Sequence, residues 1–376
     1  MENLFALLRL GLDTSTKEKE NLSNFIMLTG DQWVQLGDTA RSQGVLSILL
    51  DGIDKIENTR YGFTRELDVN QKLEWIGEVI QIEESNRRQT LVMNDLAEKW
   101  HQKGIRIMVM KGQANGLLYP NPHHRCPGDI DCYLFEDYAR GNEIARNAGA
   151  NVDEGWYKHS QISYKDELFE NHQYFVHTRD GNRGKQLEKD LEDALNVDSS
   201  DFGSMTSNIL IPPCQWTAMF LTYHACAHFV SEGLRLKQIL DWAMFLNKHQ
   251  QDVDWNQYYE YCERNHLRKF ADAMTAICVE HLGLVINNTN IVVESPYAEK
   301  ILNDTLFADD YIYNNAGGSA WKCRWLVVKN LLKYRWRYEE IYEESVWKQL
   351  WWYASGYLFH TEKLKIDYDS NTKSYD

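Results

Sequence analysis

The chain has 376 residues, of which 43% are hydrophobic and 25% charged, a composition typical of a globular protein large enough for two or three cores. Its 40 Lys and Arg against 55 Asp and Glu give a net charge of −15, which excludes non-specific coating of nucleic acid and favours a small nucleotide or one protein partner. The sequence contains no apolar run of the ~20 residues that span a membrane, no signal-peptide pattern and no CxxC pair among its seven cysteines, so we expect a cytoplasmic chain with reduced thiols.

The N-terminal part of the chain has helical patterns and no visible chemistry. Apolar residues recur near helical spacing from Leu4 to Leu50, which predicts a small helical subdomain over residues 1–74. The pattern over residues 70–103 predicts one long helix, which Gly104 ends.

A short apolar run at residues 105–110 predicts a strand that leads into Lys111 and Gly112 and then into a helix over 113–119. Glycine allows the backbone to approach a ligand closely, and the Lys111 ammonium group can meet a phosphate as a point charge. The turn is therefore a candidate phosphate site. The alternative is an ordinary strand-to-helix turn with a surface lysine.

Two aspartates begin the next predicted strand, at residues 129–135, after a loop over 120–128 that three prolines keep out of a helix. Side chains alternate along a strand, so Asp129 and Asp131 point to the same face. Adjacent carboxylates repel each other unless a cation lies between them, and hard cations such as Mg²⁺ prefer carboxylate oxygen. The pair is a candidate metal site, with a solvated acidic strand start as the alternative.

The rest of the chain predicts a helix, three strands and a helical region. The helix spans 136–148, and the strands span 152–156, 160–164 and 168–176. Glu170 and His172 share a face of the third strand. The polar segment 178–207 predicts a mobile insertion with a short helix near 185–196. After Pro212 the expected elements are all helices, at 214–230, 233–248, 255–265, 267–283, 296–308, 321–333 and 335–354.

The ordered set Lys111-Gly112, Arg125 and Asp129-Ile130-Asp131 resembles the nucleotidyltransferase superfamily, and more narrowly an uncharacterised bacterial nucleotidyltransferase family. Similarity extends to His224, His228 and the segment 236–242, and so covers about residues 90 to 280. The resemblance implies an α+β fold, in which a nucleotidyltransferase-like small mixed sheet with flanking helices is followed by a helical domain. We expect an N-terminal helical subdomain at 1–74, a catalytic domain at 75–210 and a C-terminal helical domain at 211–376.

The resemblance also implies a reaction, in which a nucleoside monophosphate moves from an NTP to a hydroxyl acceptor with the help of Mg²⁺ or Mn²⁺. Asp129 and Asp131 would bind the metal. The third carboxylate of this fold, which binds metal or acts as general base, falls at Glu170, with Asp153 and Asp166 as alternatives. The acceptor and the oligomeric state are not readable from the sequence, although the acidic charge favours a small molecule or protein over RNA.

Four further residues are candidates for contact with the nucleotide. Lys111 and Gly112 would bind its phosphates. Arg125 either binds substrate or relieves the repulsion between the two aspartates. His228 and Lys237 would reach the triphosphate from the helical domain. His224 and His228, at i and i+4 on one helix face, could hold Zn²⁺, but a third ligand is missing, and core or cleft histidines explain the pair better.

Two departures from the superfamily pattern leave another function open. Gly112 is followed by Gln113 instead of Gly or Ser, and it lies 17 residues before Asp129 instead of about a dozen. The alternative is a non-catalytic module that senses nucleotides or binds a protein and keeps the fold. A helical scaffold in which the two aspartates are incidental is a third possibility.

Overall fold

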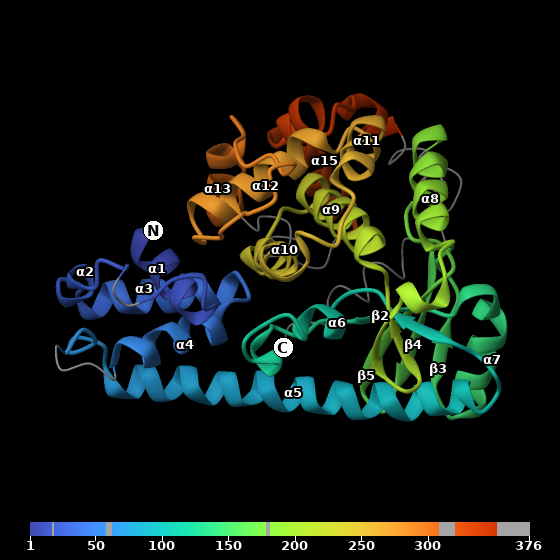
Figure 1. The fold of residues 1–376 in the computed structure, drawn as a ribbon, viewed down its shortest axis with the longest axis horizontal. Coiled ribbons are helices and arrows are strands. Elements are labelled where there is room, and N and C mark those ends of the chain that lie inside the picture. The colour runs from blue at the N-terminus through green and yellow to red at the C-terminus, as the bar shows by residue number, and fades with distance from the viewer. Residues whose placement is uncertain (17–18, 58–61, 178–180, 308–319, 352–376) are drawn as a thin grey trace.

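The computed structural model describes the chain except for residues 17–18, 58–61, 178–180, 308–319 and 352–376 (Figure 1). Four N-terminal helices come first and pack against each other through buried leucine, isoleucine and aromatic side chains. They are α1 (Glu2–Gly11), α2 (Ser23–Ile26), α3 (Gly30–Ser42) and α4 (Leu46–Glu57).

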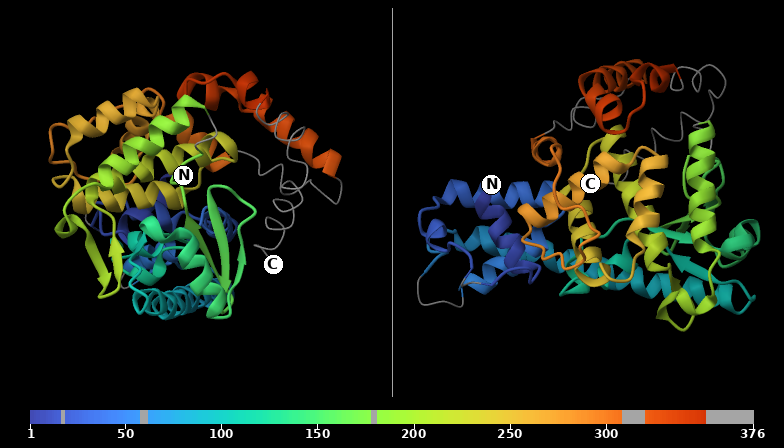
Figure 2. Two further views of the ribbon diagram at one scale, coloured as in Figure 1. Left: turned by 90° about the vertical axis from the view of Figure 1, so that its right-hand side faces the viewer. Right: turned by 45° about the horizontal axis from the view of Figure 1, so that its top comes forward.

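The long helix α5 (Val69–His101) connects these helices to the rest of the molecule. It begins at Asp68, whose carboxylate accepts hydrogen bonds from the backbone N–H groups of Asn70 and Gln71. Its first half lies under the N-terminal helices, where Trp75 is buried, and its second half lies under the sheet (Figure 1). Two other views show the C-terminal helices on the side of the sheet opposite α5 (Figure 2).

Seven strands form one mixed sheet in the order β3-β4-β5-β2-β1-β7-β6. They are β1 (Ile107–Val109), β2 (Ile130–Tyr133), β3 (Asn151–Asp153), β4 (His159–Tyr164), β5 (Glu167–His172), β6 (Gly203–Thr206) and β7 (Ile209–Ile211). β2 runs parallel to β5, and their register places Asp131 beside Glu170. This one pairing brings together residues that lie 39 positions apart in the chain.

The two faces of the sheet meet different neighbours because side chains alternate along each strand. One face packs on α5 and α7 (Tyr138–Asn147), and its core includes Trp100 and Phe169, whose rings meet edge to face. α7 approaches closely because Gly141 has no side chain. A Cβ there would lie 2.1 Å from a methyl group of Leu134. This face is closed, and the buried polar side chains under α7 are hydrogen-bonded to one another, so the ionisable groups of the site gather on the other face.

The other face is covered by helices from the second half of the chain and by the short α6 (Gln113–Gly116). The central helix is α9 (Cys214–Ser231), where Trp216 packs against Phe175 beyond the end of β5. The remaining helices are α8 (Asn182–Leu195), α10 (Leu236–His249), α11 (Trp255–Arg264), α12 (Arg268–Glu280), α13 (Ala298–Phe307) and α15 (Ala320–Lys333). Within the described residues, none of these or the other helices combines the length and the apolar character needed to cross a membrane.

The predicted α+β class is confirmed, and three local predictions are wrong. The short helix expected near 185–196 is present as α8, but the segment expected to be a mobile insertion also contains the strand β6, and the strand β7 follows it. The short apolar run Ile209–Ile211 was not predicted as a strand, but it forms β7, which pairs in parallel with β1 and antiparallel with β6 and buries Ile209. The third strand ends at His172 instead of residue 176, because the N–H groups of Phe175 and Val176 donate to the carboxylate of Glu188.

The last predicted helix, 335–354, is interrupted in the part that the structure describes. Residues Arg337–Ile341 form a π-helical turn, and residues 343–345 are not helical before a helix resumes at 346. Arg337 is buried at this irregular turn and forms an ion pair with Asp304, 2.8 Å away. A buried arginine needs such a partner, so the contact to α13 takes precedence over a regular helix.

Candidate functional site

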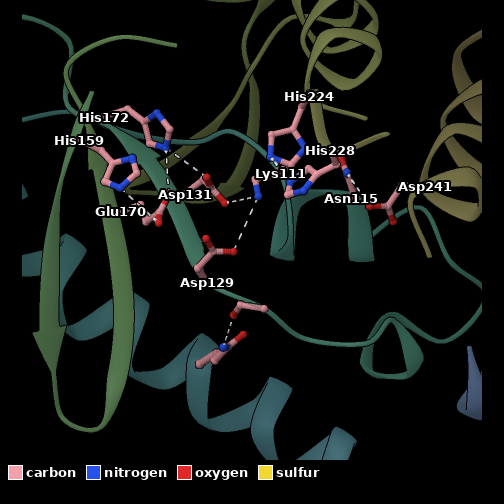
Figure 3. A network of polar contacts seen from close by, with 12 residues as sticks. Lys111, Asn115, Asp129, Asp131, His159, Glu170, His172, His224, His228 and Asp241 are labelled. Atoms are coloured by element: carbon pink, nitrogen blue, oxygen red, sulfur yellow. Dashed lines mark hydrogen bonds and ion pairs between the residues drawn. The ribbon is translucent and has the colours of Figure 1, made fainter. Parts of the chain in front are cut away.

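Three carboxylates meet on the polar face of the sheet (Figure 3). Asp131 lies in β2 beside Glu170 of β5, and Asp129 lies just before β2. One carboxylate oxygen from each residue lies within 4.8 Å of the other two. The Asp131 side chain is 2% exposed and that of Asp129 is 35% exposed, so the group has a buried floor and an open side.

The ammonium group of Lys111 lies between the two aspartates. Its Nζ atom is 2.8 Å from Oδ2 of Asp131 and 3.7 Å from Oδ1 of Asp129. Burial alone would lower the pKa of Lys111, but the charges of Asp129 and Asp131 outweigh it and raise this pKa above its usual value. The lysine that the sequence assigned to phosphate is thus the counter-ion of the aspartates in this structure.

Gly112 makes the turn that brings Lys111 to this face. Its backbone has φ 65° and ψ −105°, a conformation that residues with a Cβ rarely adopt. A Cβ at this position would lie 3.5 Å from the carbonyl oxygen of Asp129, which is ordinary contact. Backbone conformation, and not lack of space, therefore requires glycine here.

His172, the last residue of β5, contacts two of the carboxylates. The side chain is 1% exposed, and its Nε2 lies 3.1 Å from Oδ1 of Asp131 and 3.6 Å from Oε2 of Glu170. Its Nδ1 lies 3.0 Å from the carbonyl oxygen of Tyr174. Burial lowers the pKa of His172, but the hydrogen bonds to Asp131 and Glu170 outweigh this effect and raise the pKa.

His159 is a site residue that the sequence analysis missed. It lies on β4 directly opposite His172, with Nε2 3.4 Å from Oε1 of Glu170, and burial lowers its pKa to about 4. A signal was present in the sequence, because only three residues separate the strands predicted at 160–164 and 168–176, as in a hairpin; in the structure Lys165 and Asp166 form its turn with positive φ. Pairing outward from this turn places His159 beside His172.

Arg125 lies behind the turn and not on the aspartate pair. Its Nε and Nη2 atoms each donate to a carboxylate oxygen of Asp241 on α10, both at 2.8 Å. The same carboxylate accepts from the hydroxyl of Tyr119 at 2.8 Å and from the amide of Asn115 at 3.3 Å. The structure therefore gives Arg125 a different partner from both roles considered in the sequence analysis, and it ties the loop before β2 to the helical half.

The candidates from the helical half differ in position. His224 and His228 on α9 lie beside Lys111, with their Nε2 atoms 3.3 Å apart (Figure 3). Burial, followed by the nearby charge of Lys111, lowers the pKa of His224 well below its usual value. Lys237, in contrast, lies against Gly44, where its Cδ would be 3.1 Å from an added Cβ. The structure thus brings His228 to the site and places Lys237 at the N-terminal helices.

The alternative third carboxylates lie outside the group. Asp153 is exposed on the edge strand β3, where it accepts a hydrogen bond from the N–H of Gly155. Asp166 is exposed in the turn between β4 and β5. Of these three candidates, only Glu170 has a carboxylate beside the aspartate pair.

Comparison with known proteins gives one match. A family model described as an uncharacterised nucleotidyltransferase matches residues 29–283, which extend from the start of α3 to just after α12. The match includes N-terminal helices that the resemblance of about residues 90 to 280 did not reach. No curated protein and no solved structure was found that matches the chain.

Proposed function

The chain belongs to this uncharacterised nucleotidyltransferase family, and on that premise we propose that it moves a nucleoside monophosphate from an NTP to a hydroxyl acceptor with the help of a divalent metal ion. The family supports nucleotidyl transfer in general. The observation that carries the more specific proposal is the convergence of Asp129, Asp131 and Glu170 on one face of the sheet.

These residues fit a divalent ion by charge and by chemistry. Three carboxylates against the single ammonium of Lys111 leave an excess of negative charge, and carboxylate oxygens are the preferred ligands of Mg²⁺ and Mn²⁺. A metal ion bound there supplies neutralisation of the charge that develops on the phosphoryl oxygens and on the leaving pyrophosphate. We therefore assign Asp129, Asp131 and Glu170 as ligands.

Glu170 has a second possible role as the base. Although burial raises its pKa, the hydrogen bond from His172 outweighs burial and lowers the pKa, so the group is ionised at neutral pH. An ionised carboxylate can accept the proton of the acceptor hydroxyl as that oxygen attacks the α-phosphorus. The two histidines beside Glu170 hold its oxygens in place.

Lys111 and Gly112 form the proposed phosphate site. The Lys111 ammonium is already held at the carboxylates, so it needs only to turn toward the triphosphate once other positive charge reaches Asp129 and Asp131. His228 lies beside Lys111 and is a further candidate phosphate contact (Figure 3). Arg125 supports the turn through Asp241 instead of binding the nucleotide itself. The net charge of −15 favours a small-molecule or protein acceptor over a nucleic acid.

One observation favours a second candidate function, a nucleotide-binding module without transfer. Lys111 Nζ already lies between Asp129 and Asp131, where a cation is expected, and Gln113 follows Gly112 in place of a small residue. A protein that keeps its own ammonium there could bind a nucleotide and leave it intact. Turnover separates the two functions.

The decisive experiment measures pyrophosphate release from ATP, GTP, CTP and UTP with Mg²⁺ or Mn²⁺, for wild type and Asp131→Asn. Asp166→Asn is the matched control, because it makes the same substitution at an exposed carboxylate of the same sheet. We expect metal-dependent release that only Asp131→Asn abolishes. Nucleotide binding without release of pyrophosphate would favour the non-catalytic module. Equal release by wild type and Asp131→Asn would show that the reaction does not take place at the proposed site.

A further inference from the structure

Two histidines adjoin the carboxylates and have no role in the proposed transfer beyond holding Glu170. They come from neighbouring strands, His159 from β4 and His172 from β5, and their rings are 5.2 Å apart. Glu170 lies between them, with one oxygen 3.4 Å from Nε2 of His159 and the other 3.6 Å from Nε2 of His172. One ligand atom from each residue lies within 4.8 Å of the other two.

We propose that His159, His172 and Glu170 form a second cation site, selective for a divalent first-row transition ion such as Mn²⁺ or Zn²⁺ over Mg²⁺. This site goes beyond the transfer proposed above and shares only Glu170 with it. Two imidazoles and one carboxylate, with remaining positions open, form a recurrent ligand set for such ions.

The spacing of the ligand atoms agrees with direct coordination. Metal bonds to imidazole nitrogen and carboxylate oxygen are about 2.0–2.2 Å long, so two neighbouring ligands of a tetrahedral ion lie about 3.3 Å apart. The distances from Glu170 to His159 and His172 are 3.4 and 3.6 Å. Small side-chain adjustments are therefore enough to place one ion among the three groups.

Hydrogen bonding orients His172 toward this ion. Its Nδ1 donates to the carbonyl oxygen of Tyr174, so Nε2 is the nitrogen that faces Glu170 and Asp131, and an ion bound there would take the place of the Nε2 proton. A ligand histidine held by a backbone carbonyl through its other nitrogen is the usual arrangement around a bound metal.

His159 is placed for the same role. Its Nε2 faces Glu170, while its Nδ1 is buried and has no hydrogen-bond partner among the described residues. Nε2 and the Glu170 carboxylate are close enough for an ion to take the place of a proton between them. Imidazole nitrogen discriminates against Mg²⁺, which takes oxygen ligands, so the two cation sites differ in the metal that they prefer.

The test uses the metal-stripped full-length protein and Mn²⁺ as the probe. Continuous-wave EPR measures Mn²⁺ affinity, and pulsed EPR detects the ¹⁴N modulation of a coordinated imidazole. We expect ¹⁴N modulation in wild type, at least a tenfold weaker Mn²⁺ affinity with reduced modulation in His159→Ala, and little displacement by a large excess of Mg²⁺. Asp129→Asn, which alters the carboxylate pair and spares both histidines, should keep the ¹⁴N signal.

Mn²⁺ bound with no ¹⁴N modulation, or with unchanged affinity in His159→Ala, would overturn the second site. Thermal melting of His159→Ala and of the more conservative His159→Gln shows whether each variant is still folded. If His159 had only a structural role, its variants would melt at a different temperature but keep the ¹⁴N modulation of wild type. The outcome is independent of transfer. Imidazole coordination without pyrophosphate release supports this site alone, and release with an oxygen-only spectrum supports transfer alone.

Discussion

Asp131 and Asp241 are both buried aspartates, but their surroundings differ. Asp241 accepts four hydrogen bonds, two of them from the guanidinium of Arg125, and its one negative charge meets one positive charge. Asp131 faces Lys111 and His172, but Asp129 and Glu170 add two more negative charges to the same group. The charge of Asp241 is therefore balanced by groups of the chain itself, whereas the group around Asp131 keeps excess negative charge.

The difference separates a structural ion pair from a candidate site. A buried charge with all its hydrogen bonds made holds two parts of a fold together, and breaking it leaves its partner uncompensated. An acidic group with excess negative charge is stabilised by an added cation, and its carboxylate oxygens can bind that cation. We therefore expect damage at Asp241 to reduce stability, and damage at Asp131 to reduce function.

The largest expected effect is on turnover in Asp131→Asn. Loss of a ligand charge at the centre of the acidic group should lower pyrophosphate release about 10⁴-fold, equivalent to about 5 kcal/mol of transition-state stabilisation. The free energy of unfolding should fall by less than about 2 kcal/mol, because Asp129 remains beside Lys111. Steady-state kinetics and urea denaturation of the same preparation check both values. A variant that unfolds and loses activity in parallel would show that Asp131 is structural.

The next effect is on stability in Asp241→Ala, which should lower the free energy of unfolding by about 3–5 kcal/mol because Arg125 stays buried without a counter-ion. A double-mutant cycle with Arg125→Met isolates the pair, since the double variant should recover part of the loss. Urea denaturation gives all four values. A single-variant loss below about 1 kcal/mol would place this ion pair among those that contribute little.

A third effect concerns Gly112, in the turn that follows β1. Gly112→Ala forces a side chain into a left-handed conformation and should cost about 1–3 kcal/mol, with weaker nucleotide binding because Lys111 shifts. Gly128→Ala is the matched control, because that glycine has neither positive φ nor atoms within 4 Å of an added Cβ. Denaturation and nucleotide titration of both variants check this. Equal behaviour of the two would mean that the Gly112 backbone is not constrained.

The sequence predicted the parts of the site that depend on local alternation. A period of two is enough to place Asp129 with Asp131, and Glu170 with His172, on common faces. Pairing across β4 and β5 was also within reach, because the hairpin turn at Lys165 is local. These inferences use residues that are close in the chain.

The parts that could not be predicted depend on contacts between distant segments. Arg125 and Asp241 are 116 positions apart, and nothing in either local pattern indicates the other. Similarly, the parallel pairing of β7 with β1 places Ile209 beside Ile107, which is distant in the chain. Lys237 shares its helix with Asp241, but the start of α10 rests on the loop around Gly44, so its side chain faces the N-terminal helices. The helix register alone did not show this.

The smallest expected effect concerns a third charge group, in which His124 lies between two carboxylates. Its Nδ1 is 2.7 Å from Asp51 and its Nε2 is 2.8 Å from Glu83, so one imidazolium joins α4 to α5. Burial lowers the pKa of His124, but the hydrogen bonds to Asp51 and Glu83 outweigh it and raise the pKa.

Because the folded pKa of His124 is higher than the unfolded value of about 6.5, its contribution is fully present below pH 6.5 and is lost as pH rises through the folded pKa. We expect the free energy of unfolding to fall by roughly 1 kcal/mol between pH 6 and pH 8.5 for this reason. His124→Gln should remove that part of the pH dependence, and urea denaturation of both proteins across this range measures it. Parallel curves for the two proteins would show that the contacts of His124 contribute equally at every pH, as those of Asp241 do. Curves that diverge as pH rises would show that the group around His124 depends on a proton, as the acidic group around Asp131 depends on a cation.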